Sequence, residues 1–86
     1  MNYRATPQTI FRVIDNTVIA LNLGTGQYYT MNEVGTCVWV LLEQEASTAN
    51  IIEAIESDFD GPVEQITEDL AAFLDDLQDC GLIEEV

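Results

Sequence analysis

The sequence lacks histidine and has only two basic residues, Arg4 and Arg12, in a chain of 86. Histidine is the usual general base, the commonest metal ligand and the partner that activates a cysteine nucleophile. The two cysteines, Cys37 and Cys80, have no CxxC spacing, which argues against zinc and iron–sulfur sites and favours reduced, buried thiols. We therefore expect no enzymatic activity, no cofactor and no metal.

Long hydrophobic runs are missing as well. The longest apolar run covers residues 38–42 (VWVLL), far short of the ~20 residues that a membrane span needs. The first residues, MNYR, have no apolar stretch behind a basic start, so no signal peptide is visible. These absences predict a cytoplasmic protein without a membrane anchor.

The chain is instead rich in negative charge. It has 16 acidic residues and a formal net charge of −14, and from residue 13 onward every charged side chain is a carboxylate. Such a surface repels phosphate groups, so we expect neither nucleic acids nor anionic membranes as partners. A basic peptide or a basic patch on another protein would be attracted. The alternative is that the acidity only keeps the protein in solution.

The first third of the chain has the pattern of an antiparallel sheet. Two β-prone runs, Thr9 to Ile14 and Thr17 to Leu23, flank the polar pair Asp15-Asn16, which predicts a hairpin. After the turn at residues 24–26, Gln27 to Met31 is rich in aromatic and β-branched residues and predicts a third strand. Three strands cannot bury their apolar face alone, so helices must share their core.

Three amphipathic helices are expected next. The first follows the N-cap Asn32 and ends before the polar stretch 43–46, and the second begins after Ser47 or Thr48. The third runs from about Val63 to Cys80 and stops at Gly81, and the tail 82–86 is expected to pack back as an extended end. The prediction is a single α+β domain with the order βββααα.

A calcium site is the one metal motif that the sequence suggests. Residues 56–61 (ESDFDG) place acids at the first, third and fifth positions and a glycine at the sixth, as in an EF-hand loop. Thr67 stands where the bidentate glutamate is required, and Pro62 follows the glycine. A helix end with solvated acids is the better interpretation.

Two parts of the sequence resemble the PqqD-like family. The first is residues 18–35 (VIALNLGTGQYYTMNEVG), followed by Trp39 and the leucines at 41–42. The second is residues 69–77 (DLAAFLDDL), closed by residues 81–83 (GLI). The resemblance covers about residues 8 to 86, and residues 1–8 are expected to form a flexible N-terminal arm.

The resemblance implies a winged helix-turn-helix fold that acts as a recognition element in the maturation of ribosomally synthesised peptides. Such an element binds the leader of a precursor peptide and presents it to a leader peptidase and a cyclase or other modifying enzyme. Stand-alone members of this length look most like the leader-binding proteins of lasso-peptide biosynthesis. The alternatives are a PqqD-like chaperone for a radical-SAM or pyrroloquinoline quinone pathway, and an acidic winged-helix regulator that docks on a basic protein.

The expected third strand supplies a sheet edge that no charged residue guards. Proteins usually protect a free edge with lysine, proline or a bulge, so an uncharged edge is a candidate for β-strand addition by a peptide. A tyrosine that faces inward would instead serve only to cover the core. The candidate contact residues are Gln27, Tyr28, Tyr29, Thr30 and Met31.

The third helix is the other wall of the peptide groove, as the resemblance implies. Asp69, Phe73 and Asp76 lie on one flank of its apolar stripe, with Leu77 nearer the centre. Phe73 would offer an apolar pocket and the two acids would meet cations of the leader. The alternatives are a core phenylalanine flanked by solvated acids, or a pocket formed by Leu74 on the opposite flank.

Overall fold

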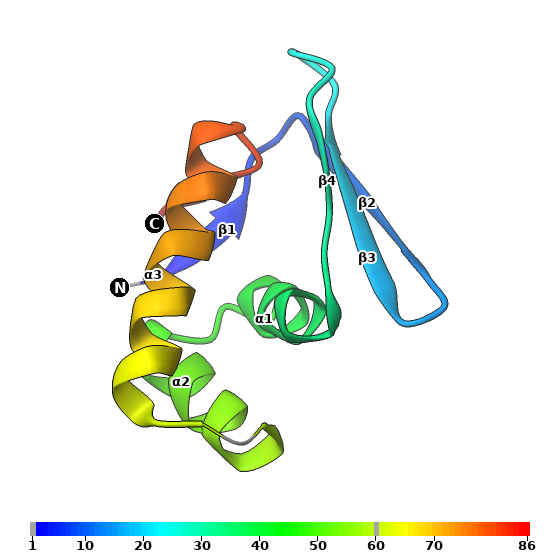
Figure 1. Cartoon of the computed structure of the whole chain (residues 1–86). Coiled ribbons are helices and arrows are strands. Elements are labelled where there is room, and N and C mark those ends of the chain that lie inside the picture. The colour runs from blue at the N-terminus through cyan, green and yellow to red at the C-terminus, as the bar shows by residue number, and fades with distance from the viewer. Residues whose placement is uncertain (1, 60) are drawn as a thin grey trace.

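The computed structural model describes residues 2–59 and 61–86 and has eight elements (Figure 1). These are β1 (Tyr3–Ala5), β2 (Thr9–Ile14), β3 (Thr17–Asn22), β4 (Tyr28–Thr30), α1 (Glu33–Glu43), α2 (Thr48–Asp58), α3 (Val63–Asp79) and β5 (Ile83–Glu85). The predicted α+β order of three strands followed by three helices is confirmed. None of the described helices is long and apolar enough to cross a membrane.

The central sheet is the predicted meander, with strand order β2-β3-β4. Asp15 and Asn16 both have positive φ, 51° and 62°, and so form the tight turn whose twist suits a two-residue hairpin. The register pairs Ile14 with Thr17 across β2 and β3, and Ala20 of β3 with β4. β4 is two residues shorter than the expected strand 27–31.

The helices begin where their capping residues predict. The side chain of Asn32 accepts a hydrogen bond from the Gly35 amide at the start of α1, and that of Ser47 accepts one from the Asn50 amide at the start of α2. α3 ends just before Gly81, whose φ of 70° is strained for other residues.

The two ends of the chain meet in a second small sheet. β1 pairs antiparallel with β5, which confirms that the tail packs back as an extended end. Arg4 and Glu84 add an ion pair of 3.0 Å, and the Thr6 hydroxyl donates to the Gly81 carbonyl at 2.8 Å. These contacts correct the expectation of a flexible arm over residues 1–8, because residues 3–6 are held by β5 and the end of α3. Met1 lies outside the described residues.

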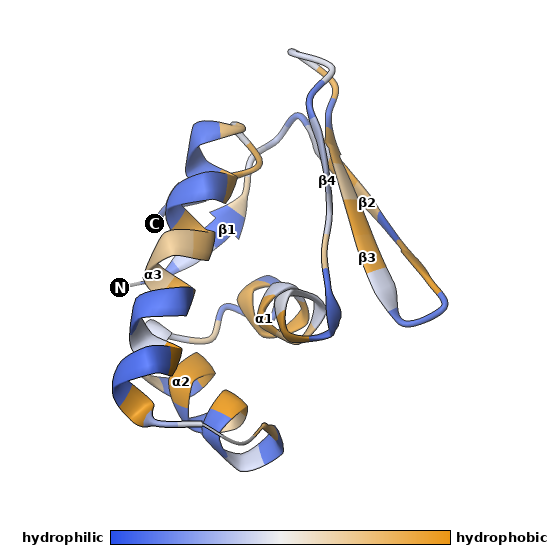
Figure 2. Ribbon diagram, viewed as in Figure 1, coloured by the Kyte–Doolittle hydropathy of each residue, from blue (hydrophilic) through white to orange (hydrophobic). Residues whose placement is uncertain are grey.

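One hydrophobic core joins the strands to the helices (Figure 2). Trp39 of α1 lies at its centre with no exposed surface, and its ring meets Phe11 of β2 edge to face at 5.5 Å. Its indole nitrogen has no hydrogen-bond partner among the described residues. The buried members are Val18, Ala20, Met31, Val38, Trp39, Leu42, Ile51, Ile55, Leu70, Leu74, Leu77, Leu82 and Ile83.

Asn22 is a buried polar residue that fastens the sheet to the end of α3. Its side-chain oxygen accepts hydrogen bonds from the amides of Gly24 (2.8 Å) and Thr25 (3.2 Å). Its side-chain nitrogen donates to the carbonyls of Gly81 (2.9 Å) and Cys80 (3.3 Å). One side chain therefore orders the β3–β4 turn and the α3 terminus together.

We predict that Asn22→Leu lowers the free energy of unfolding by about 2 kcal/mol, because it keeps the volume and leaves buried backbone groups unpaired. Urea denaturation followed by circular dichroism measures the change. Asn50→Leu, at an exposed position of α2, is the matched control and should change stability by less than about 0.5 kcal/mol. Equal effects of the two substitutions would contradict the structural role of Asn22.

Candidate functional site

The outer edge of β4 offers unpaired backbone groups. The Asn22 amide donates to the Gln27 carbonyl at 2.8 Å and the Met31 amide donates to the Val18 carbonyl at 2.9 Å. Because alternate residues of an antiparallel strand face the same neighbour, Gln27, Tyr29 and Met31 turn toward β3. The amides and carbonyls of Tyr28 and Thr30 therefore turn away from it, on a side where the described chain supplies no further strand.

The two tyrosines of β4 have different environments. Tyr29 faces the core and is half-buried, and its ring meets Phe73 of α3 edge to face with centroids 5.8 Å apart. Tyr28 lies on the opposite face of the sheet and is 71% exposed. The Tyr29–Phe73 contact links the free strand edge to the helix that was expected to face it.

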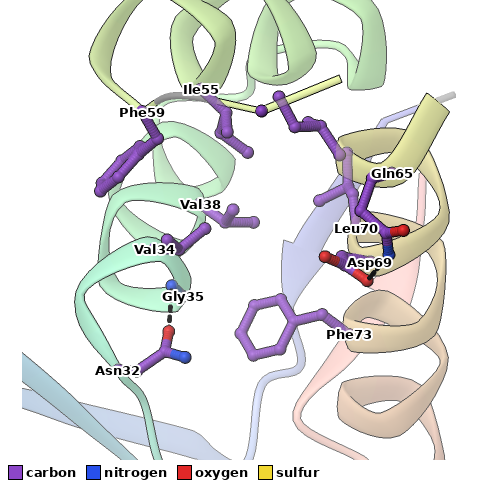
Figure 3. Close-up of a pocket in the computed structure, with 12 residues that line it drawn as sticks. Asn32, Val34, Gly35, Val38, Ile55, Phe59, Gln65, Asp69, Leu70 and Phe73 are labelled. Carbon is purple, nitrogen blue, oxygen red and sulfur yellow. Dashed lines mark hydrogen bonds between the residues drawn. The ribbon is translucent and has the colours of Figure 1, made fainter. Parts of the chain in front are cut away.

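A cavity of about 350 Å³ lies next to this contact, between the start of α1, the end of α2 and the first half of α3 (Figure 3). Phe73 takes part in both features, and Asn32, which follows β4 closely, also lines the cavity. Phe73 therefore connects the edge of β4 to the cavity. The cavity is lined by Asn32, Val34, Gly35, Val38, Ile55, Phe59, Gly61, Gln65, Ile66, Asp69, Leu70 and Phe73.

Gly35 allows α1 to approach the ring of Phe73 on α3 closely. A Cβ atom at this position would lie 3.1 Å from Cζ of Phe73 and 3.2 Å from Cβ of Met31. Even an alanine would have to displace the ring or the start of the helix. The absence of a side chain here thus sets how near Phe73 lies to the end of β4.

Of the two α3 acids that the sequence indicates as contact residues, only Asp69 lies in the cavity wall. Asp69 lines the cavity and accepts a hydrogen bond from the Gln65 side chain at 2.9 Å. Asp76 is exposed, one turn beyond Phe73 on the same flank. The carboxylates supply negative charge beside an apolar hollow, which suits a peptide that carries both apolar and basic side chains.

Two of the nine expected contact residues have buried side chains. Met31 is 1% exposed and Leu77 is fully buried, so both support the site from the core. Gln27 is exposed immediately before β4. Leu74, the competing pocket residue, is also in the core and does not line the cavity.

Sequence reasoning missed the cavity residues of α1 and α2. Val34, Val38, Ile55 and Phe59 belong to the apolar stripes of the expected helices, and such a stripe predicts only that its residues are buried. A stripe shows which side of a helix is apolar. It does not show where two packed stripes diverge and leave a hollow.

The thiol of Cys37 is poorly suited to nucleophilic attack. Burial, and then the negative charge of Asp58, raise the pKa of the Cys37 thiol, so less of the reactive thiolate forms at neutral pH. Among residues 2–59 and 61–86, no three acidic or cysteine side chains gather as a metal site would require. Asp60, part of the calcium-like stretch, lies outside the described residues.

Comparisons with known proteins agree with this geometry. TbiB1, solved in complex with the TbiA(beta) leader peptide, is 29% identical, with a TM-score of 0.91 and 96% of each chain covered. A lasso peptide synthetase B1 complexed with the leader peptide has the same fold, with 19% identity, a TM-score of 0.89, and 99% of this chain and 100% of that chain covered. A search of curated proteins gives no match. Residues 17–83 match the family model of coenzyme PQQ synthesis protein D, and the chain therefore belongs to the PqqD family.

Proposed function

We propose that this protein binds the leader segment of a ribosomally synthesised precursor peptide as an added strand on β4. It then presents the peptide to the enzymes of a lasso-type maturation pathway, such as a leader peptidase and a cyclase. The observation that carries this proposal is the free edge of β4 beside an apolar cavity. The similarity to TbiB1, which was solved with a leader peptide, supports it.

The binding mode follows from the backbone of β4. A peptide that lies along the free edge pairs its amides and carbonyls with those of Tyr28 and Thr30, whatever its sequence. Its side chains then point alternately to the outer face of the sheet and to the side of Phe73. Backbone pairing thus supplies sequence-independent affinity, and the Phe73 side supplies selectivity.

The cavity next to Phe73 selects an apolar side chain. Its volume of about 350 Å³ accommodates an aliphatic or aromatic group, and its walls are largely hydrocarbon from three helices. Burial of such a group stabilises the complex by roughly 1.5–3 kcal/mol. Asp69 at the wall and Asp76 beyond it are placed to attract basic residues of the same peptide.

The proposed role is recognition without catalysis. The chain has no histidine, the residue that most often activates a cysteine nucleophile. We propose that the whole chain acts as a single peptide-binding domain, because β1 and β5 join its two ends. The part of the precursor beyond the paired leader stays available to the enzymes.

Strand addition predicts a period of two in the leader. A series of synthetic leaders, each with one N-methylated amide, should alternate between weakened and normal binding along the paired segment. Methylation at a residue whose amide faces β4 removes a hydrogen bond and adds a clash, and we expect at least a tenfold rise in Kd. Methylation at the next residue, whose amide faces away from β4, is the internal control.

Fluorescence anisotropy measures each Kd, with the leader of a lasso-type precursor from the genome that encodes this protein. A loss of affinity that follows no alternation would show that the leader does not bind as a strand. No binding by the unmodified leader would reject the proposed function as a whole.

Aromatic substitutions should separate binding from folding. We predict that Phe73→Ala and Tyr29→Ala weaken leader binding by about 2 kcal/mol, roughly thirtyfold, because both rings join β4 to the cavity. Tyr28→Ala should leave the free energy of unfolding within about 0.5 kcal/mol of wild type, since its side chain is mostly exposed.

Anisotropy and urea denaturation on the same variants test this. Leu74→Ala is the control, because Leu74 is buried outside the cavity, so it should lower stability without a specific loss of affinity in the folded protein. If Phe73→Ala, Tyr29→Ala and Tyr28→Ala all bind the leader as tightly as wild type, the leader does not bind beside β4 and Phe73.

Charge should affect the rate of association. Asp69→Asn with Asp76→Asn is expected to slow the association of a leader that carries lysine or arginine severalfold at low salt and to change dissociation much less. Glu68→Gln with Asp75→Asn removes the same charge from other positions of α3 and is the matched control. Stopped-flow measurements at two ionic strengths provide the rates. An association rate independent of salt would mean that the acidity serves solubility alone.

A further inference from the structure

The β2–β3 hairpin has an apolar outer face that the helices leave uncovered. Val18 and Ala20 of β3 point into the core and are fully buried, so their strand neighbours point to the opposite face. On β2, Ile10 and Ile14 remain 49% and 52% exposed. In Figure 1 the hairpin lies on the far side of β4 from α3, and in Figure 2 much of its ribbon has the colour of hydrophobic residues. The outer face comprises Ile10, Arg12, Ile14, Ile19 and Leu21.

Arg12 lies in the middle of this outer face. The register places it opposite Ile19, with Ile10 and Ile14 two residues away on either side along β2. Arg4, the other cation of the chain, is paired with Glu84, whereas the described residues provide no ion-pair partner for Arg12. Arginine is enriched at the centres of protein–protein interfaces, where surrounding apolar side chains exclude water. Arg12 and the aliphatic side chains around it have this composition.

The charge of the chain argues against a second copy as the partner. A symmetric contact through the outer face would bring the Arg12 side chains of both copies close together. It would also join two molecules that each carry a net charge of −14. The face fits instead an apolar surface of a different protein that carries a carboxylate to pair with Arg12.

The outer face is continuous with the proposed leader site. β4 pairs with β3, and exposed Tyr28 lies beside Leu21 on the outer side of the sheet. A leader bound on the free edge of β4 would extend this side by one strand, so a protein docked there would also lie next to the leader. Leader binding at the cavity, on the other side of the sheet, leaves the outer face open.

We propose that the outer face of the β2–β3 hairpin docks an enzyme that modifies or cleaves the precursor, through an apolar surface bearing a carboxylate opposite Arg12. This inference rests on the proposed function, because it assigns the second partner of the same peptide complex. Docking at the hairpin holds the enzyme beside the bound leader without competing for the β4 edge.

Biolayer interferometry with the purified leader peptidase of the same pathway tests the docking surface, with the protein loaded with the precursor leader. Ile10→Ser with Ile14→Ser, and separately Arg12→Glu, should each weaken enzyme binding at least tenfold. Val63→Ser is the matched control because Val63 is 51% exposed at the start of α3, and it should change binding less than twofold. Leader affinity, measured by anisotropy on the same variants, should stay within twofold of wild type.

The two readouts separate the two proposals. Normal leader binding together with undiminished enzyme binding by the hairpin variants would overturn the docking surface and leave the leader site intact. Failure of the leader to bind wild-type protein would overturn the proposed function itself. A wild-type dimer in analytical ultracentrifugation that Ile10→Ser with Ile14→Ser dissociates would also overturn the inference, by showing that a second copy covers the face.

Discussion

Each residue of an antiparallel strand directs its backbone hydrogen bonds to one side only, and the site depends on this constraint. Asn22 and Val18 of β3 bond to β4, so the alternate residues Tyr28 and Thr30 keep their amides and carbonyls on the open side. The same alternation turns Tyr29 inward to meet Phe73. A shift of one residue in the β3–β4 register would bury Tyr28 in place of Tyr29 and separate the free edge from the cavity.

Charge is distributed unevenly between the helices and the β2–β3 hairpin. The helices carry most of the carboxylates, including those that flank Phe73, and form the side on which we propose that a leader binds. The hairpin is nearly free of acids, presents aliphatic side chains and carries Arg12. In the proposed arrangement, a basic peptide and an apolar protein surface would be attracted to different sides of one sheet, and the two partners would not compete.

The sequence predicted elements whose signals are local. The pair Asp15-Asn16 marks the hairpin turn, and Asn32 and Ser47 mark helix starts, because each acts on residues within one turn of itself. The extended tail was expected, but its pairing with β1 escaped prediction because strands of three residues have no measurable period and pair across the whole chain. The cavity escaped as well, since a residue in an apolar stripe lines a hollow or fills the core depending on how neighbouring helices diverge.

Trp39 gives the protein a built-in optical probe. It is the one tryptophan of the sequence, and it lies buried between α1 and Phe11 of the hairpin. Its ultraviolet fluorescence therefore reports whether the hairpin is seated on the helices, and exposure to water on detachment would shift the emission to longer wavelength. Trp39 does not line the cavity beside Phe73. Its emission spectrum therefore distinguishes loosening of the hairpin from binding of a peptide in that cavity.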